Sequence, residues 1–204
     1  MSNDKNTELE KAAVDFLQND FNQCFDQVRY YDAQIVDVFK FLATFYTTIA
    51  GIAIGLYQYS IDKGLDIKAA LIVGLTIAFI FGLCMFFLIV RNRVYFVFCM
   101  RYINEQRGLF LSAKPLGFEN KSKMYTNCAK PPFFNILSSQ SWWLYLVGIL
   151  NSALLAVILY VAGQTIITIA ISCVLVCAIQ LFSGIGYLNS RENKSASAAV
   201  FGKE

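Results

Sequence analysis

The sequence contains no histidine, only three prolines and, over long stretches, no charged residue at all. Without histidine, the chain lacks the commonest general base, the commonest metal ligand and the usual pH-sensitive group. It also lacks a P-loop, a nucleophile elbow, a Gly-rich dinucleotide turn and an HExxH motif. We therefore expect a protein that is not an enzyme and that needs no cofactor or metal.

Two further patterns are missing. The six cysteines include no CxxC pair, and none falls in a segment that we place outside the cell. Reduced thiols are the simplest interpretation, because Cys173 and Cys177 share a helix face but have no further ligands to complete a metal site. A large basic excess is also missing, since the net charge is only +3. We accordingly expect no nucleic-acid partner.

Four long apolar segments dominate what is present, at residues 39–59, 69–90, 142–162 and 165–188, and their only charged residue is Lys40 at the start of the first. Each has about 20 residues or more, which at 1.5 Å per residue crosses a hydrocarbon core of about 30 Å. No segment alternates apolar and polar residues as a transmembrane barrel requires. The sequence therefore predicts an all-α integral membrane protein with four transmembrane helices.

The connections and the basic residues predict how these segments are arranged. The turn at 60–68 and the pair Gly163–Gln164 are short, so we expect two hairpins, 39–90 and 142–188. Fifteen of the 17 Lys and Arg residues lie outside the turn at 60–68; Lys40 stands at the start of the first apolar run, and the other fourteen lie outside the runs. The positive-inside rule then places both termini and the long loop in the cytoplasm of a multi-pass inner-membrane protein. The expected cytoplasmic parts are a helix at 1–38, a helix plus basic loop at 91–141, and a tail at 189–204.

A regular apolar seam marks the N-terminal segment. Residues 8–38 read as one amphipathic helix whose apolar positions alternate three and four apart, typical of a heptad. The seam consists of Val14, Leu17, Phe21, Cys24, Val28, Tyr31, Ile35 and Val38. One interpretation is packing on the same chain, and the other is an intermolecular coiled coil or ring contact. The pattern leaves both open.

The second span is expected to continue into the cytoplasm as a helix to Ser112, ended by the segment 114–117. It would pack on the first helix as a stalk. The rest of the loop is basic and holds every proline, and we expect residues 131–134 along the membrane surface. The residues expected to contact lipid head groups are Arg91, Arg93 and Lys130. We expect the tail to be disordered.

Small residues recur every four positions in the first two spans. This spacing lets helix backbones approach closely, and a self-packing face within the hairpin is the simplest interpretation. If one stripe is not used in this way, it is free for a neighbouring subunit. The residues concerned are Thr47, Gly51, Gly55, Gly74, Ala78 and Gly82.

Polar residues inside the spans are few. No Asp, Glu, Lys or Arg lies in the central part of a span, which argues against an ion-coupled transporter or a voltage sensor. Asn151 and Gln180 are the two amides available. They either bond each other between helices or line a water-filled path between subunits.

The layout over residues 8–112 resembles small oligomeric bacterial membrane proteins that include predicted pore-forming effectors of anti-phage systems. The resemblance rests on the N-terminal helix, hairpin and helical extension, with sequences such as Tyr30-Tyr31-Asp32 and Arg101-Tyr102-Ile103-Asn104. It implies an oligomeric membrane protein in antiviral defence, and it assigns no individual functional residue.

The leading functional hypothesis is a homo-oligomeric channel, pore or membrane-perturbing effector that is controlled from its cytoplasmic stalk. A membrane scaffold that recruits a cytosolic protein is the alternative. A transporter of an uncharged or lipidic substrate is the third. In each case membrane lipid is an expected partner.

Overall fold

The computed structural model describes residues 2–114, 117–121 and 130–194, and within these ranges it contains four α-helices and no strand. They are α1 (Ser2–Lys63), α2 (Lys68–Ser112), α3 (Ser139–Val161) and α4 (Ile166–Lys194). All four are long and apolar enough to cross a membrane. The expectation of an all-helical, multi-pass membrane protein is therefore supported at that level.

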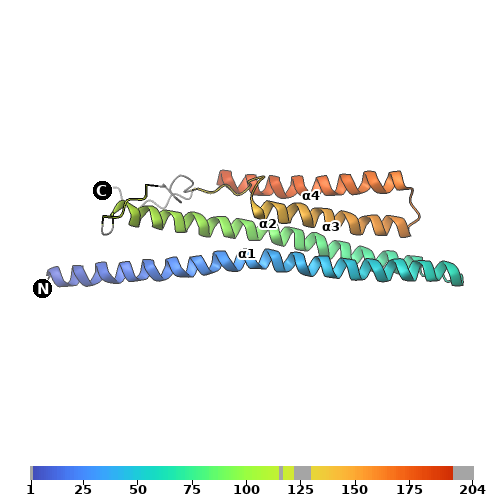
Figure 1. Cartoon of the computed structure of the whole chain (residues 1–204), viewed down its shortest axis with the longest axis horizontal. Coiled ribbons are helices and arrows are strands. Elements are labelled where there is room, and N and C mark those ends of the chain that lie inside the picture. The colour runs from blue at the N-terminus through green and yellow to red at the C-terminus, as the bar shows by residue number, and fades with distance from the viewer. Residues whose placement is uncertain (1, 115–116, 122–129, 195–204) are drawn as a thin grey trace.

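The two long helices lie side by side and run in opposite directions (Figure 1). Gly64, at φ 68°, makes the turn between them, a backbone conformation that glycine adopts without strain. The shorter α3 and α4 pack along one half of this pair, so that α1 and α4 form opposite sides of the bundle (Figure 1). The other half of α1 and α2 extends beyond them.

The start of α3 and the end of α4 differ from the bounds expected from the sequence. α3 begins at Ser139 because the Ser138 hydroxyl caps it by accepting a hydrogen bond from the Ser141 amide at 3.2 Å. α4 continues to Lys194, so residues 189–194 are helical rather than disordered as we expected for the tail. The remainder of that expectation, residues 195–204, lies outside the described residues.

The core lies where the helices meet. Its fully buried side chains include Phe86, Ile35, Leu42, Leu75, Ile89, Leu154 and Leu188. Gly184 of α4 lets that helix approach α2, because a Cβ there would lie 3.1 Å from the Phe86 ring. Large apolar side chains cover the outside of α4, where Val174 is 71% and Phe182 is 73% exposed. Such a surface suits contact with hydrocarbon.

Candidate functional site

A buried polar cluster joins all four helices within the apolar part of the bundle. The Tyr46 hydroxyl of α1 donates to Asn151 Oδ1 of α3 at 2.7 Å. Asn151 Nδ2 donates to Gln180 Oε1 of α4 at 2.8 Å and to the Gly82 carbonyl of α2 at 3.3 Å. One amide on α3 therefore connects the other three helices.

Local sequence explains why the helices can meet there. A Cβ on Gly82 would collide with the Tyr46 hydroxyl and lie 2.5 Å from Asn151 Oδ1. Glycine at this position is what allows the two polar groups to reach α2. Gln180 Nε2, which is buried, has no hydrogen-bond partner among the described residues.

Asn151 and Gln180 adopt the first of the two arrangements that the sequence allowed, a bond between helices. Asn151 and Gln180 bond each other, and they are 0% and 4% exposed. In the single chain they therefore line no open path. Sequence reasoning missed Tyr46, because a tyrosine at a buried helical position is indistinguishable from an apolar residue until its hydroxyl has a partner.

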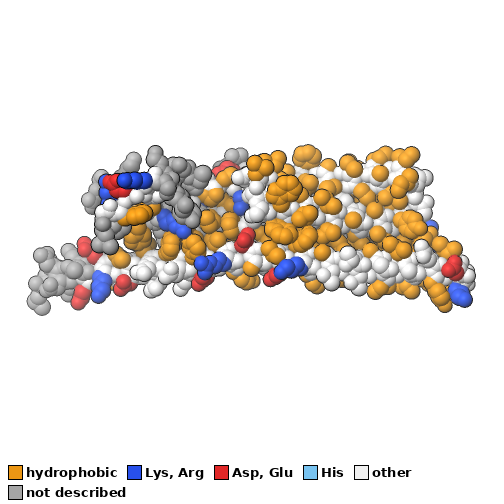
Figure 2. Space-filling view, viewed as in Figure 1, with side chains coloured by type: hydrophobic (Ala, Val, Ile, Leu, Met, Phe, Trp, Pro, Cys, Tyr) orange, Lys and Arg blue, Asp and Glu red, His pale blue; other side chains and the backbone are white. Residues whose placement is uncertain are grey.

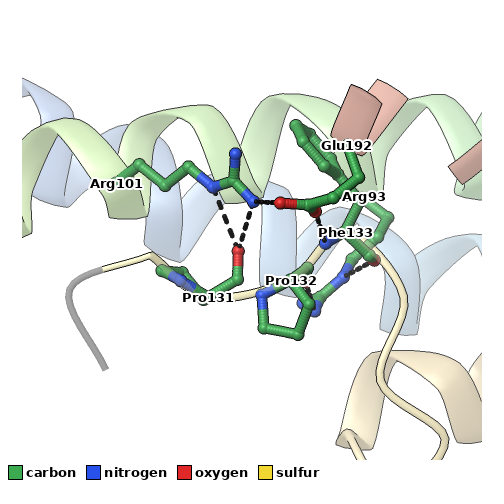
Figure 3. Close-up of polar contacts among 6 residues, drawn as sticks. All are labelled: Arg93, Arg101, Pro131, Pro132, Phe133 and Glu192. Atoms are coloured by element: carbon green, nitrogen blue, oxygen red, sulfur yellow. Dashed lines mark hydrogen bonds and ion pairs between the residues drawn. The ribbon is translucent and has the colours of Figure 1, made fainter. Parts of the chain in front are cut away.

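A second cluster lies beyond the apolar part, where two arginines of α2 hold the segment that precedes α3 (Figure 3). Arg93 donates from Nε to the Phe133 carbonyl at 2.9 Å and from Nη2 to the Pro132 carbonyl at 3.0 Å. Arg101 donates to the Pro131 carbonyl from Nε at 3.1 Å and from Nη2 at 2.9 Å. These carbonyls lie in a segment without helical partners, so the guanidinium groups satisfy them.

The C-terminal part of α4 completes the cluster. Glu192 accepts from Arg101 Nη2 at 2.6 Å through Oε1 and from the Phe133 amide at 3.2 Å through Oε2. The Arg101 guanidinium also lies 4.5 Å from the centre of the Phe133 ring. We call Arg93, Arg101, Glu192 and the segment 131–133 the loop clamp. It fixes the end of α4 and the segment before α3 to α2.

The clamp corrects two expectations about lipid contact. Arg93 is only 6% exposed and Phe133 is 0% exposed, so other parts of the chain cover both side chains and neither is open to lipid. The physical reason is the unsatisfied backbone of the Pro-Pro segment, which needs buried donors that the two arginines supply. Arg91 and Lys130 are exposed, and their contact with head groups stays a prediction.

Gln140 links the clamp to α1. Its Oε1 accepts from Arg93 Nη1 at 2.9 Å, and its Nε2 donates to Asp32 Oδ1 at 3.2 Å. Burial lowers the pKa of Arg93, which lies beyond the predicted span 69–90, to about 10, although the Asp32 carboxylate acts in the opposite direction. The guanidinium therefore remains charged at neutral pH and can keep its hydrogen bonds to Phe133, Pro132 and Gln140.

The heptad seam faces α2 in this structure. Ile35 is fully buried, most of the other seam residues are half-buried, and Val14 near the N-terminus is 49% exposed. The Tyr31 ring stacks on Tyr95 of α2 with centroids 6.1 Å apart. Burial raises the pKa of the Cys24 thiol on the seam and of the Cys99 thiol on α2. A role of the seam between subunits stays a prediction.

The small-residue stripes do not form a self-packing face within the chain, except at two positions. Ala78 and Gly82 are buried, and Gly82 contacts Tyr46. Thr47 is exposed, and a Cβ on Gly51, Gly55 or Gly74 would meet nothing within 4 Å. The expectation was wrong for these four residues. Residues spaced four apart can lie along any side of a helix, so this spacing does not indicate which side meets a neighbour.

No protein-family model matches this chain, and neither the curated proteins nor the solved structures contain a significant match to it.

Proposed function

We propose that this chain is a homo-oligomeric membrane protein without catalytic activity that acts as a channel, pore or membrane-perturbing effector and is controlled from its cytoplasmic end. In this proposal α1 and α2 form one transmembrane hairpin, and α3 and α4 form the other. Both termini and the loop between α2 and α3 lie in the cytoplasm of an inner membrane. The parts of α1 and α2 that extend beyond α3 and α4 form the stalk.

The observation that carries the proposal is the continuity of the two long helices. α1 has 62 residues and α2 has 45, and neither is interrupted between its apolar part and its polar part. At 1.5 Å per residue, α1 alone is about 90 Å long, roughly three times the thickness of a hydrocarbon core. A displacement of the stalk would therefore be transmitted directly to the spans.

The loop clamp supports the same proposal. It lies at the boundary between the stalk and the spans and ties α2 to both ends of the second hairpin. Gln140 extends this connection to Asp32 of α1. A movement of the stalk would thus reach all four helices through the loop clamp and Gln140.

The experiment is to purify the full chain in a mild detergent, measure its particle mass, and reconstitute it in liposomes that contain a fluorescent dye. We expect a particle of several chains, each of 23.0 kDa, and release of ions or dye. A strictly monomeric particle would contradict the proposal. Oligomers that leave the liposomes sealed under every condition, including after a protein has bound to the stalk, would also contradict it.

One observation favours the scaffold as a second candidate. Phe16 and Tyr30 lie in the stalk part of α1 and are 67% and 62% exposed, which suits contact with another protein. A sealed liposome together with specific capture of a soluble protein by the wild type, lost in Tyr30→Ser, would favour the scaffold. The role in antiviral defence that the layout suggested stays a prediction.

A further inference from the structure

One side of α1 carries small, polar and charged residues, whereas the outer side of α4 carries large apolar side chains. We define the outward face of α1 as the side opposite Ile35 and Leu42, which are fully buried. It consists of Asp26, Arg29, Ala33, Asp37, Lys40, Thr44, Gly51, Gly55 and Gln58, all exposed. In the apolar part of α1 this face carries no large apolar side chain.

The contrast with the other spans is quantitative. The most apolar window of α1 has a mean hydropathy of 1.5, against 2.8, 2.3 and 2.5 for α2, α3 and α4. Figure 2 shows the same contrast, because α1 has a pale strip along the border of the molecule where the other helices are covered with hydrophobic side chains. A face of threonine, glycine and glutamine gains little from hydrocarbon and suits helix contact or water.

The stalk part of the outward face carries charges in a regular order. Asp26 pairs with Arg29 at 3.9 Å, and Asp37 pairs with Lys40 at 3.8 Å. At about 100° per residue, the two acids lie along one edge of the face and the two bases lie along the other, about 60° away. The acidic edge and the basic edge are therefore both exposed, and they are complementary to each other.

This charge order specifies a partner. If a second copy of α1 lies parallel to the first, its basic edge meets the acidic edge, as the e and g positions of a parallel coiled coil do. The contact joins two different edges, so it repeats from copy to copy and closes into a ring when the rotation allows. An antiparallel copy or an unrelated helix would not reproduce this match at both Asp26 and Asp37.

A groove beside the acidic edge offers room for the neighbour. It lies between α1 and α2, has a volume of about 410 Å³, and is mostly apolar in its lining. Tyr30, Asp37 and Phe41 line it from α1, and Met85 and Leu88 line it from α2. Side chains of a second copy packed at the acidic edge would fill this groove.

We infer that the outward face of α1 is the surface on which copies of this chain assemble, parallel and side by side, with the acidic edge of one α1 against the basic edge of the next. In such a ring the middle of the face points to the axis. Thr44, Gly51 and Gln58, spaced seven residues apart, then line the path through the membrane. The inference rests on the proposed function, and it places the path on α1 rather than at Asn151 and Gln180.

The first test compares two glycines that are equivalent in the single chain. A Cβ on Gly51 or on Gly74 meets nothing within 4 Å, so neither Gly51→Leu nor Gly74→Leu should disturb the fold of one chain. Gly51 lies on the outward face, and Gly74 lies on α2. We expect Gly51→Leu to lower the particle mass in mild detergent or the flux through liposomes, and Gly74→Leu to leave both as in the wild type.

The second test is in the stalk and does not depend on packing in the membrane. Asp37→Lys places like charges opposite each other between copies and should reduce the oligomer about tenfold. The double variant Asp37→Lys/Lys40→Asp swaps the acidic and the basic residue at positions 37 and 40. Opposite charges then meet again between copies, so it should restore assembly. Arg91→Glu, an exposed charge on α2, is the control and should have no effect.

The outcomes separate the two proposals. Oligomers that are unchanged by both Gly51→Leu and Asp37→Lys would overturn the α1 surface and leave the proposed function standing. A wild type that is monomeric would contradict the proposed function itself. Loss of assembly in Asp37→Lys without recovery in the double variant would contradict the match between the edges.

Discussion

The Arg101 side chain of α2 and the Glu192 side chain of α4 form an ion pair of 2.6 Å in which the arginine is 3% exposed and the glutamate is 45% exposed. The pair thus joins a buried cation to a carboxylate at the edge of the protein. Glu192 also holds the Phe133 amide, so one side chain near the end of α4 secures the loop that leads into α3.

Glu192→Gln should destabilise the fold. The variant removes the charge that faces a buried guanidinium, and a hydrogen bond to a charged group contributes about 1.5–3 kcal/mol. We expect a loss toward the lower end of that range, because Glu192 is partly exposed. Thermal unfolding in detergent would measure it. Glu119→Gln is the matched control, since its pair with Lys114 is exposed on both sides. Equal effects of the two variants would contradict the importance of the clamp.

Asn151→Ala should destabilise the packing of all four helices. It leaves Gln180 Oε1 without its donor and leaves the Tyr46 hydroxyl with only the longer contact of 3.5 Å to the Ala78 carbonyl among the bonds that the described residues make. Hydrogen bonds between membrane helices contribute about 0.6 kcal/mol on average and up to about 2 kcal/mol. Unfolding by a denaturing detergent, in a double-mutant cycle with Gln180→Ala, would measure the coupling. Fully additive effects would show that the two amides do not act together.

Gly82→Ala should be far more harmful than Gly74→Ala. The added methyl group at position 82 collides with the Tyr46 hydroxyl, whereas at position 74 it meets open space. Overpacking of this kind costs about 1–3 kcal/mol. We expect a lower unfolding midpoint for Gly82→Ala only. Tyr46→Phe should relieve part of the loss in the double variant, because it removes the atom that the methyl group meets.

Arg93→Lys should release the segment 131–133 although the charge is kept. A lysine cannot donate from three nitrogens in one plane, and so it cannot hold the Pro132 and Phe133 carbonyls and Gln140 together. Faster hydrogen exchange of the peptide that contains the Phe133 amide would report the release. Arg91→Lys, on the exposed side of α2, should not change it. If Arg93→Lys instead weakened binding to anionic lipid and left this exchange unchanged, the result would support the lipid head-group contact that the sequence predicted for Arg93.

The thiols of Cys24 and Cys99 should make the packing of α1 on α2 sensitive to alkaline pH. Burial raises both pKa values above the ordinary thiol value of 9.0, so the folded chain keeps these thiols protonated when an unfolded chain has begun to ionise. The stability that they contribute is complete below pH 9 and is lost as the pH rises through the folded pKa values. Alkylation by iodoacetamide at pH 8.5 should be slower at Cys24 and Cys99 in the folded protein than after unfolding. Equal rates would contradict the shift.

Sequence alone determined the helices of this protein, because length, hydropathy and the absence of breakers act locally. The run at 69–90 lies within α2, the run at 142–162 ends one residue beyond α3, and the end of α2 at Ser112 agrees with the expected stop before Lys114. The heptad seam from Phe21 to Val38 could also be predicted from the sequence, since a heptad repeat is a property of one helix.

Tertiary structure decided which residues meet. Tyr46 joins Asn151 across 105 positions, and Arg101 joins Glu192 across 91, and no local pattern specifies such partners. The same holds for the glycines, since Gly82 is in contact with α1 and α3 whereas Gly51 is open on the outside. A periodic pattern fixes which residues share a helix face, but the packing of all four helices fixes which face is buried and which remains for a second copy.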